Sequence, residues 1–135
     1  MVGVEVHRTQ QFARWTATLV EKAKSGDTYS ALVAKHVLDE LNYLKALDAK
    51  PNEDTATLKR VRQSGKHQVW RVSHPYDPRT AVRLICWFDE DSDTVVVALF
   101  ANDKVAMGDV FYNSVGSRAD QIISEWKAQN EGRRP

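Results

Sequence analysis

The chain has 135 residues, of which 42% are hydrophobic and 27% charged, and its formal net charge is +1. This length and composition predict one globular domain over residues 1–135, with a flexible tail at 130–135, and argue against wholesale disorder. No apolar run approaches the ~20 residues that cross a bilayer, and the N-terminus lacks the basic and hydrophobic regions of a signal peptide. We therefore expect a cytoplasmic protein without a membrane contact.

Cysteine and histidine usage narrows the chemistry further. Cys86 is the only cysteine, so an intramolecular disulfide is excluded and the sequence predicts a small core residue at this position. The four histidines are scattered along the chain without the spacing of metal ligands. We expect neither a metal nor a cofactor.

Positive charge is concentrated in the middle of the chain. Residues 58–87 carry seven Lys or Arg side chains against a single acid, Asp77, which gives this segment a net charge of +6. The flanking segments 1–57 and 88–135 carry net charges of −1 and −4. A local positive field of this kind attracts a phosphate backbone even when the whole protein is nearly neutral.

Two helices are predicted in the N-terminal third. Thr9 caps a helix over residues 10–24, in which apolar residues recur at three- and four-residue spacing. A second helix, capped by Asp27 or Thr28, carries a broad apolar stripe over residues 28–49. Because the connection between them is so short, the two helices are expected to form an antiparallel hairpin.

The remainder of the chain predicts strands and one more helix. The strand segments, of which the first two are the weakest, are 2–7, 58–63, 69–73, 81–88 and 94–100. A helix starting at Ser114 or Ser117 runs to Gln129. Short connections require antiparallel pairing, so we expect an α+β fold with the helix hairpin on one face of an antiparallel sheet of three to five strands. The other face is then free for a ligand.

An arginine stands inside the most apolar of these strands. A charge at Arg83 is costly unless the side chain points away from the core or is paired. Strand alternation places Arg83 on one face with Ile85 and Trp87, and it directs Trp70 and Arg71 to opposite faces. If the Arg83 face is open, Trp87 is available to stack on a base and Trp70 belongs to the core.

These features resemble the RelE/ParE superfamily, the toxins of bacterial type II toxin–antitoxin systems. The likeness covers residues 10–125. Its most specific part is the strand arginine, Arg83, together with three residues that follow the last strand: Lys104, Tyr112 and the helical arginine Arg118. In the RelE branch it implies a metal-independent, ribosome-dependent mRNA endonuclease that arrests translation. The resemblance assigns catalysis to Arg83, Tyr112 and Lys104. It places Arg60 and Arg71 at the family's basic strand positions. The candidate substrate-binding residues are these two together with Arg62, Arg118 and the stacking candidate Trp87.

The same resemblance implies partners. They are a cognate antitoxin protein, the ribosome and mRNA. The ParE branch keeps the fold and acts on DNA gyrase, so the alternative is a non-nucleolytic gyrase inhibitor or an inactive binding module on the same fold. Members are commonly shorter and more basic than this chain.

The chemistry of such a nuclease can be stated from the residues alone. Cleavage of RNA without a metal needs a base for the 2′-hydroxyl, an acid for the leaving 5′-oxygen and positive charge for the phosphorane oxygens. Arginine suits the last task because its guanidinium makes two parallel bonds to phosphate. A tyrosine with a pKa of ~10 becomes a credible base when cations such as Arg83 or Lys104 lower that pKa. The histidines His67 and His74 are the alternative proton carriers.

Overall fold

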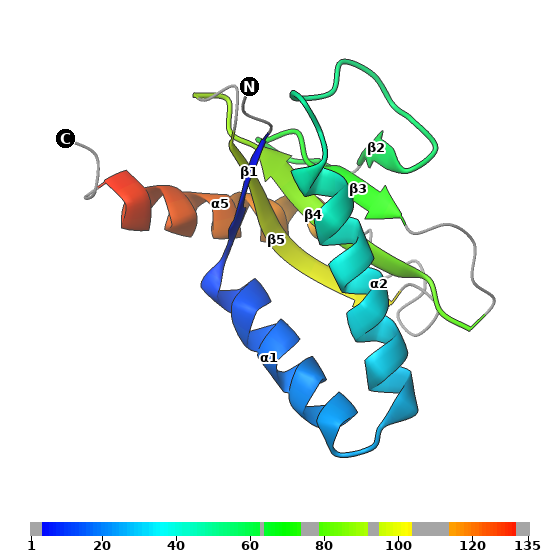
Figure 1. Cartoon of the computed structure of the whole chain (residues 1–135). Coiled ribbons are helices and arrows are strands. Elements are labelled where there is room, and N and C mark those ends of the chain that lie inside the picture. Colours follow the sequence, from blue (N-terminus) through cyan, green and yellow to red (C-terminus); the bar gives the residue numbers. More distant parts are fainter. Residues whose placement is uncertain (1–3, 63, 74–78, 92–94, 104–113, 132–135) are drawn as a thin grey trace.

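The computed structural model describes residues 4–62, 64–73, 79–91, 95–103 and 114–131. Within these ranges three helices and five strands follow one another along the chain (Figure 1). They are β1 (Glu5–Arg8), α1 (Gln10–Lys24), α2 (Thr28–Lys45), β2 (Leu58–Arg60), β3 (Trp70–Ser73), β4 (Val82–Phe88), β5 (Val95–Asp103) and α5 (Val115–Glu131). None of the helices in these ranges is both long and apolar enough to cross a membrane.

The N-terminal helix hairpin forms as its capping residues predict. The hydroxyl of Thr9 accepts a hydrogen bond from the backbone N–H of Phe12 at 3.1 Å, and Asp27 accepts two backbone N–H groups at the start of α2. Gly26 has a φ of 106° in the turn between the helices, a conformation that a Cβ disfavours. α1 and α2 lie side by side as an antiparallel pair (Figure 1). The expected hairpin is confirmed, although α2 ends earlier than predicted, at Lys45.

The five strands form one mixed sheet in the order β1-β5-β4-β3-β2. The meander from β2 to β5 is antiparallel, as its short connections predict. The expectation of a purely antiparallel sheet is wrong, because β1 pairs parallel to β5, with Glu5 opposite Val95 and Arg8 opposite Ala98. Short connections constrain only strands that are consecutive in the chain. The helix hairpin separates β1 from β2 and leaves β1 to pair with the last strand of the meander.

The two faces of the sheet are covered by different helices (Figure 1). α1 and α2 pack on what we call the hairpin face, and α5 packs on the opposite side, the α5 face. The hairpin-face core includes Phe12, Leu44, Val72, Leu84 and Cys86. The α5-face core includes Ile85, Trp87, Val97, Leu99 and Ile123. The expectation that the second face is left free is therefore wrong, because the apolar stripe of α5 needs a surface to bury it.

A β-bulge interrupts the pairing of β4 with β5. The register shifts after Ile85, which pairs with Phe100, and Leu99 is left without a partner in β4. As a result Leu99 and Phe100 both belong to the α5-face core although they are adjacent in the chain. The carbonyl of Leu99 accepts a hydrogen bond from the Thr9 hydroxyl at 2.9 Å. The residue that caps α1 therefore also provides a hydrogen-bond donor for a backbone carbonyl in the bulge.

Candidate functional site

Cationic side chains from three strands share the α5 face. Residues that pair directly across neighbouring strands point to the same side of a sheet. Lys59 pairs with Arg71, and Arg71 pairs with Ile85 of the α5-face core. Arg83 stands two residues before Ile85 in β4 and has the same orientation. Together with Arg118, described next, we call Lys59, Arg71 and Arg83 the cationic site.

The fourth cation comes from α5. The guanidinium carbon of Arg118 lies 4.1 Å from the centroid of the Phe100 ring, and Phe100 pairs with Ile85. The bulge directs this ring toward α5. The row from Lys59 through Arg71 to Phe100 crosses three interstrand spacings, roughly 14 Å. Burial lowers the pKa of the Arg118 guanidinium, but arginine keeps its charge at neutral pH.

The Arg83 side chain is half-buried, and only part of its hydrogen-bonding capacity is used within the described residues. Its Nη1 donates a hydrogen bond to the carbonyl of Val82 at 3.1 Å. Its Nε is buried and has no hydrogen-bond partner among the described residues. A buried donor without an acceptor costs about 1–3 kcal/mol. The Arg83 side chain is thus held half-buried at the sheet surface at some cost in stability.

A buried carboxyl group lies on the opposite side of the sheet. Glu40 of α2 is 2% exposed, and neither of its carboxyl oxygens has a hydrogen-bond partner among the described residues. Burial raises the pKa of Glu40 to about 9, while the charge of Arg83 acts to lower it and that of Asp39 to raise it. Glu40 is therefore neutral at pH 7 and does not cancel the charge of the cationic site. Sequence reasoning missed it because it stands within the apolar stripe of its helix.

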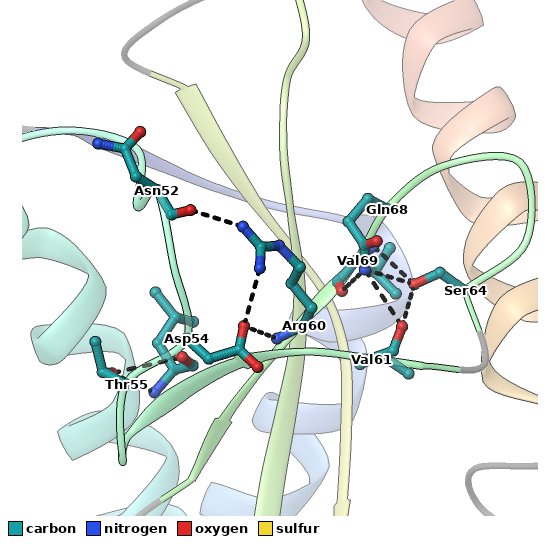
Figure 2. A network of polar contacts seen from close by, with 9 residues as sticks. Asn52, Asp54, Thr55, Arg60, Val61, Ser64, Gln68 and Val69 are labelled. Atoms are coloured by element: carbon teal, nitrogen blue, oxygen red, sulfur yellow. Dashed lines mark hydrogen bonds and ion pairs between the residues drawn. The ribbon is translucent and has the colours of Figure 1, made fainter.

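Arg60 lies away from the cationic site. It pairs with Trp70 of the hairpin-face core, and its guanidinium carbon is 4.9 Å from the centroid of a Trp70 ring. Figure 2 shows its Nη2 donating to the carbonyl of Asn52 at 2.7 Å, with Nη1 3.5 Å from Oδ1 of Asp54. These contacts tie β2 to the preceding loop. Arg62, also predicted to bind substrate, is exposed in the turn after β2.

Trp87 is not available to stack on a base. Its side chain is 0% exposed beneath α5, where it contacts Trp126 and His67 edge to face at centroid distances of 5.8 and 5.6 Å. The prediction of a stacking role is wrong, because α5 covers this part of the sheet. Trp70 is buried in the hairpin-face core, as strand alternation predicted.

Of the candidate proton carriers, the structure describes only His67. The residues Lys104, Tyr112 and His74 lie outside the described residues. The Nδ1 of His67 is 3.1 Å from Oε1 of Glu90, and its ring packs on Trp87. Trp87 is four residues from Arg83 along β4, roughly 13 Å away. Of the predicted catalytic set, only Arg83 is described, and it lies with Arg71 and Arg118 rather than with His67.

Asp120 fixes α5 to the loop between β2 and β3. Its carboxylate accepts hydrogen bonds from the backbone N–H groups of Lys66 at 2.7 Å and His67 at 3.0 Å. Gly65 lies so close that a Cβ there would meet this carboxylate. We call these two hydrogen bonds the clamp of α5. Asp120 follows Arg118 by two residues, so the clamp helps to hold the Arg118 side chain over the sheet. Nothing in the sequence pattern identifies Asp120 or Lys59 as special, because both depend on which segments meet in space.

Metal and thiol chemistry find no support in the described segments. Within them, no group of three or more His, Cys, Asp or Glu side chains is arranged to hold a metal ion. Cys86 is buried in the hairpin-face core, and burial raises the pKa of its thiol. The prediction of a small core residue at Cys86 is confirmed.

The comparisons with known proteins were negative. No family model matches the chain, and no curated protein or solved structure matches it significantly.

Proposed function

We propose that the chain is the toxin of a bacterial type II toxin–antitoxin system, of the RelE/ParE kind, and that it cleaves mRNA on the ribosome without a metal. The observation that carries this proposal is the cationic site, in which Lys59, Arg71 and Arg83 share one sheet face beside Arg118. A helix hairpin covering the opposite face is also a feature that the resemblance implies.

The spacing of the cations favours a polyanion. Charges spread over roughly 14 Å of sheet surface match several phosphates of a nucleic-acid strand better than one small anion. Arginine offers a planar pair of donors to phosphate, and the Arg83 side chain is half-buried on the α5 face of the sheet. Arg118, stacked on an aromatic ring and partly desolvated, is less screened by salt than a fully exposed charge.

The proposed reaction assigns charge stabilisation to Arg83. The 2′-oxygen attacks the adjacent phosphorus, its proton passes to a base, and the bond from phosphorus to the 5′-oxygen breaks as that oxygen takes up a proton. The products are a 2′,3′-cyclic phosphate and a free 5′-hydroxyl. Arg83 stabilises the charge on the phosphorane oxygens, and Arg71, Lys59 and Arg118 hold flanking phosphates. Tyr112 remains the proposed proton-transfer residue, with Lys104 lowering its pKa.

A cognate antitoxin follows from the same proposal. A toxin with four clustered cations is held inactive when an acidic segment neutralises them. A partly disordered acidic tail that orders on the cationic site would do so, in the cytoplasm where the ribosomes are. Charge reversal at Arg71 or Arg83 is expected to weaken that complex.

The test compares Arg83→Gln with Arg14→Gln, which removes the same charge from an exposed position of α1 on the other side of the sheet. Each variant is induced in growing cells, and mRNA is mapped for new 5′ ends. Arg83→Gln is expected to lower the cleavage rate by ~10²–10³ and to relieve growth arrest, because a positioned charge-stabilising donor is lost. Arg14→Gln is expected to behave as the wild type.

Two results would contradict the nuclease proposal. One is growth arrest with intact mRNA and inhibited DNA supercoiling, which identifies the gyrase-inhibitor alternative. The other is undiminished mRNA cleavage by Arg83→Gln protein that is folded, as judged by its circular dichroism spectrum. Absence of any growth arrest by the wild-type chain would favour an inactive binding module.

A further inference from the structure

The outer side of the helix hairpin carries an open groove between α1 and α2, with a volume of about 730 Å³. Apart from Arg8 in β1, every lining residue belongs to one of the two helices. The groove therefore lies away from the sheet interior and from the cationic site, which occupies the α5 face. A site of this size is within the range that binds ligands and peptide side chains.

The sequence of each helix explains why a groove forms here. On α2 the residues that line it recur at three- and four-residue spacing, and two of them, Val37 and Leu41, also belong to the hairpin-face core. Small residues, Ala17 and Ala34, let the surface sink between the helices, and Val37 and Leu41 form an apolar floor. The lining is continuous and mostly apolar, unlike a surface with isolated hydrophobic residues.

Two large apolar residues stand exposed at the borders of this groove. Val20 of α1 is 42% exposed and Leu38 of α2 is 53% exposed. Both face the groove from opposite helices, so a ligand that enters it would remove both from water. Covering this apolar surface is favourable because it removes apolar area from water.

The charges around the groove are mostly positive. Arg8, Lys24 and Lys35 line it against a single acid, Glu21. A ligand with apolar groups at its centre and carboxylates at its sides is complementary to this surface. A second copy of the chain would bring the same positive border against itself, which opposes self-association.

We propose that this groove binds an amphipathic helix of a partner protein, one that inserts an apolar i, i+3, i+4, i+7 stripe and presents Glu or Asp along both sides of it. The carboxylates lie against Lys24, Lys35 and Arg8, and the apolar stripe covers Val20 and Leu38. A concave groove flanked by helices suits a convex helix better than a flat lipid surface. The inference does not depend on nuclease activity, because it uses no residue of the cationic site.

The location of the groove relative to the cationic site has a specific consequence for binding. The groove and the cationic site lie on opposite sides of the sheet, so a helix in the groove leaves the cationic site open. The chain is therefore expected to bind a helix and an RNA strand at the same time. A partner that inhibits by covering the cations must reach them with a second segment.

The experiment uses the full chain and a synthetic peptide of about four helical turns, with Leu at the stripe positions, Glu on both sides and a fluorescent label. A second peptide has Lys in place of each Glu. Fluorescence anisotropy measures the dissociation constants. The Glu peptide is expected to bind at least about tenfold more tightly than the Lys peptide, and Leu38→Asp is expected to weaken it by at least about tenfold.

Matched variants distinguish peptide binding in the groove from a general effect of the protein's charge. Lys35→Glu faces the groove and is expected to weaken the Glu peptide about three- to tenfold, while Lys45→Glu makes the same charge change on α2 outside it and is expected to leave binding unchanged. Arg83→Gln and added single-stranded RNA are also expected to leave peptide affinity unchanged. A loss of peptide binding on adding RNA would overturn the separate location of the two sites.

Three further results would overturn the proposal. They are equal binding of the two peptides, a groove-dependent dimer in sedimentation that Leu38→Asp dissociates, and binding to anionic phospholipid vesicles that Lys24→Glu and Lys35→Glu abolish. The second identifies another copy of the chain as the occupant, and the third identifies a membrane. Circular dichroism of Leu38→Asp verifies that any loss of binding is not a loss of fold.

Discussion

The two faces of the sheet differ in how completely they are covered and in what charge they hold. The hairpin face is closed by two helices, and the carboxyl group of Glu40 in α2 is buried there and neutral at pH 7. The α5 face is divided. Its aromatic part lies beneath α5, and its other part carries Arg71 and Arg83 half-buried at the surface. A sheet with only one fully covered face can keep cations at its surface without moving them into the core.

The two faces of the sheet also differ in how they accommodate an ionisable side chain. Glu40 loses its charge because burial raises its pKa, and neither carboxyl oxygen has a hydrogen-bond partner among the residues that the structure describes. Arg83, by contrast, is half-buried at the sheet surface and donates a hydrogen bond to the backbone carbonyl of Val82. We therefore expect substitutions on the hairpin face to change mainly stability and substitutions in the cationic site to change mainly the proposed RNA binding.

The largest effect on stability is expected at Glu40. Its pKa of about 9 in the folded state lies above its ordinary value of 4.5, so folding holds a proton that the unfolded chain has released between these pH values. Stability therefore falls as pH rises from 4.5 toward 9, and the cost at pH 7 is about 3 kcal/mol. Glu40→Met is expected to recover it.

Urea unfolding of the Glu40→Met variant from pH 5 to 9 measures this effect. Its free energy of unfolding is expected to exceed that of the wild type at pH 8 and to match it more closely at pH 5. Glu21→Gln, an exposed carboxylate on α1, serves as the control and is expected to leave the pH profile unchanged. An unaltered profile in Glu40→Met would mean that another group titrates.

The next effect is expected where the two faces are joined, at Thr9. Its hydroxyl caps α1 at Phe12 and donates to the bulge carbonyl of Leu99. Thr9→Val keeps the shape and removes both bonds, so a loss of about 2 kcal/mol in unfolding free energy is expected. Thr18→Val removes a hydroxyl bonded only to its own exposed helix and is expected to cost less than about 0.5 kcal/mol. Equal losses in thermal unfolding would argue against the bridging role.

A smaller effect is expected at the clamp of α5. In Gly65→Ala the new methyl group displaces the Asp120 carboxylate from the backbone N–H groups of Lys66 and His67. We expect a loss of about 1 kcal/mol in stability and a few-fold loss of RNA affinity, because Arg118 is held less firmly. Adding Asp120→Ala to Gly65→Ala is expected to have little further effect. Additive losses in the double mutant would show that the two residues act separately.

The smallest effect tests the assignment of arginines to faces. Arg60→Gln, on the hairpin side of β2, is expected to cost less than about 1 kcal/mol in stability and to leave the salt dependence of RNA binding unchanged. Arg71→Gln is expected to reduce the slope of log K against log salt by about 0.7 for a single strand. If the two substitutions change the slope equally, the division between the faces is wrong.

Much of the fold was accessible from sequence periodicity. The helix caps at Thr9 and Asp27 and the antiparallel strands around Arg83 follow from local chemistry, and the structure confirms them. The opposite orientation of Trp70 and Arg71 also follows, because alternation needs no knowledge of neighbours. The parallel pairing of β1 could not be predicted in this way, because its partner is distant in the chain.

The site was less accessible than the fold. Arg60 and Arg71 look alike in the sequence, and only their cross-strand partners show that they lie on different faces. The burial of Trp87 depends on where α5 packs, and the direction of Phe100 depends on a bulge that no residue type announces. Local patterns identify which residues are cationic, whereas tertiary contacts decide which of them meet.

The hydrogen bond from Thr9 to Leu99 spans 90 residues, and it belongs to the parallel pairing of the first strand with the last. During synthesis β1 and the helix hairpin leave the ribosome long before β5 exists. The antiparallel meander has nearer neighbours and is expected to assemble first, while closing the long loop to β1 comes late. Full assembly of the sheet therefore waits until residues 95–103 have been made. The chain's order of elements thus delays completion of the sheet until β5 has been synthesised.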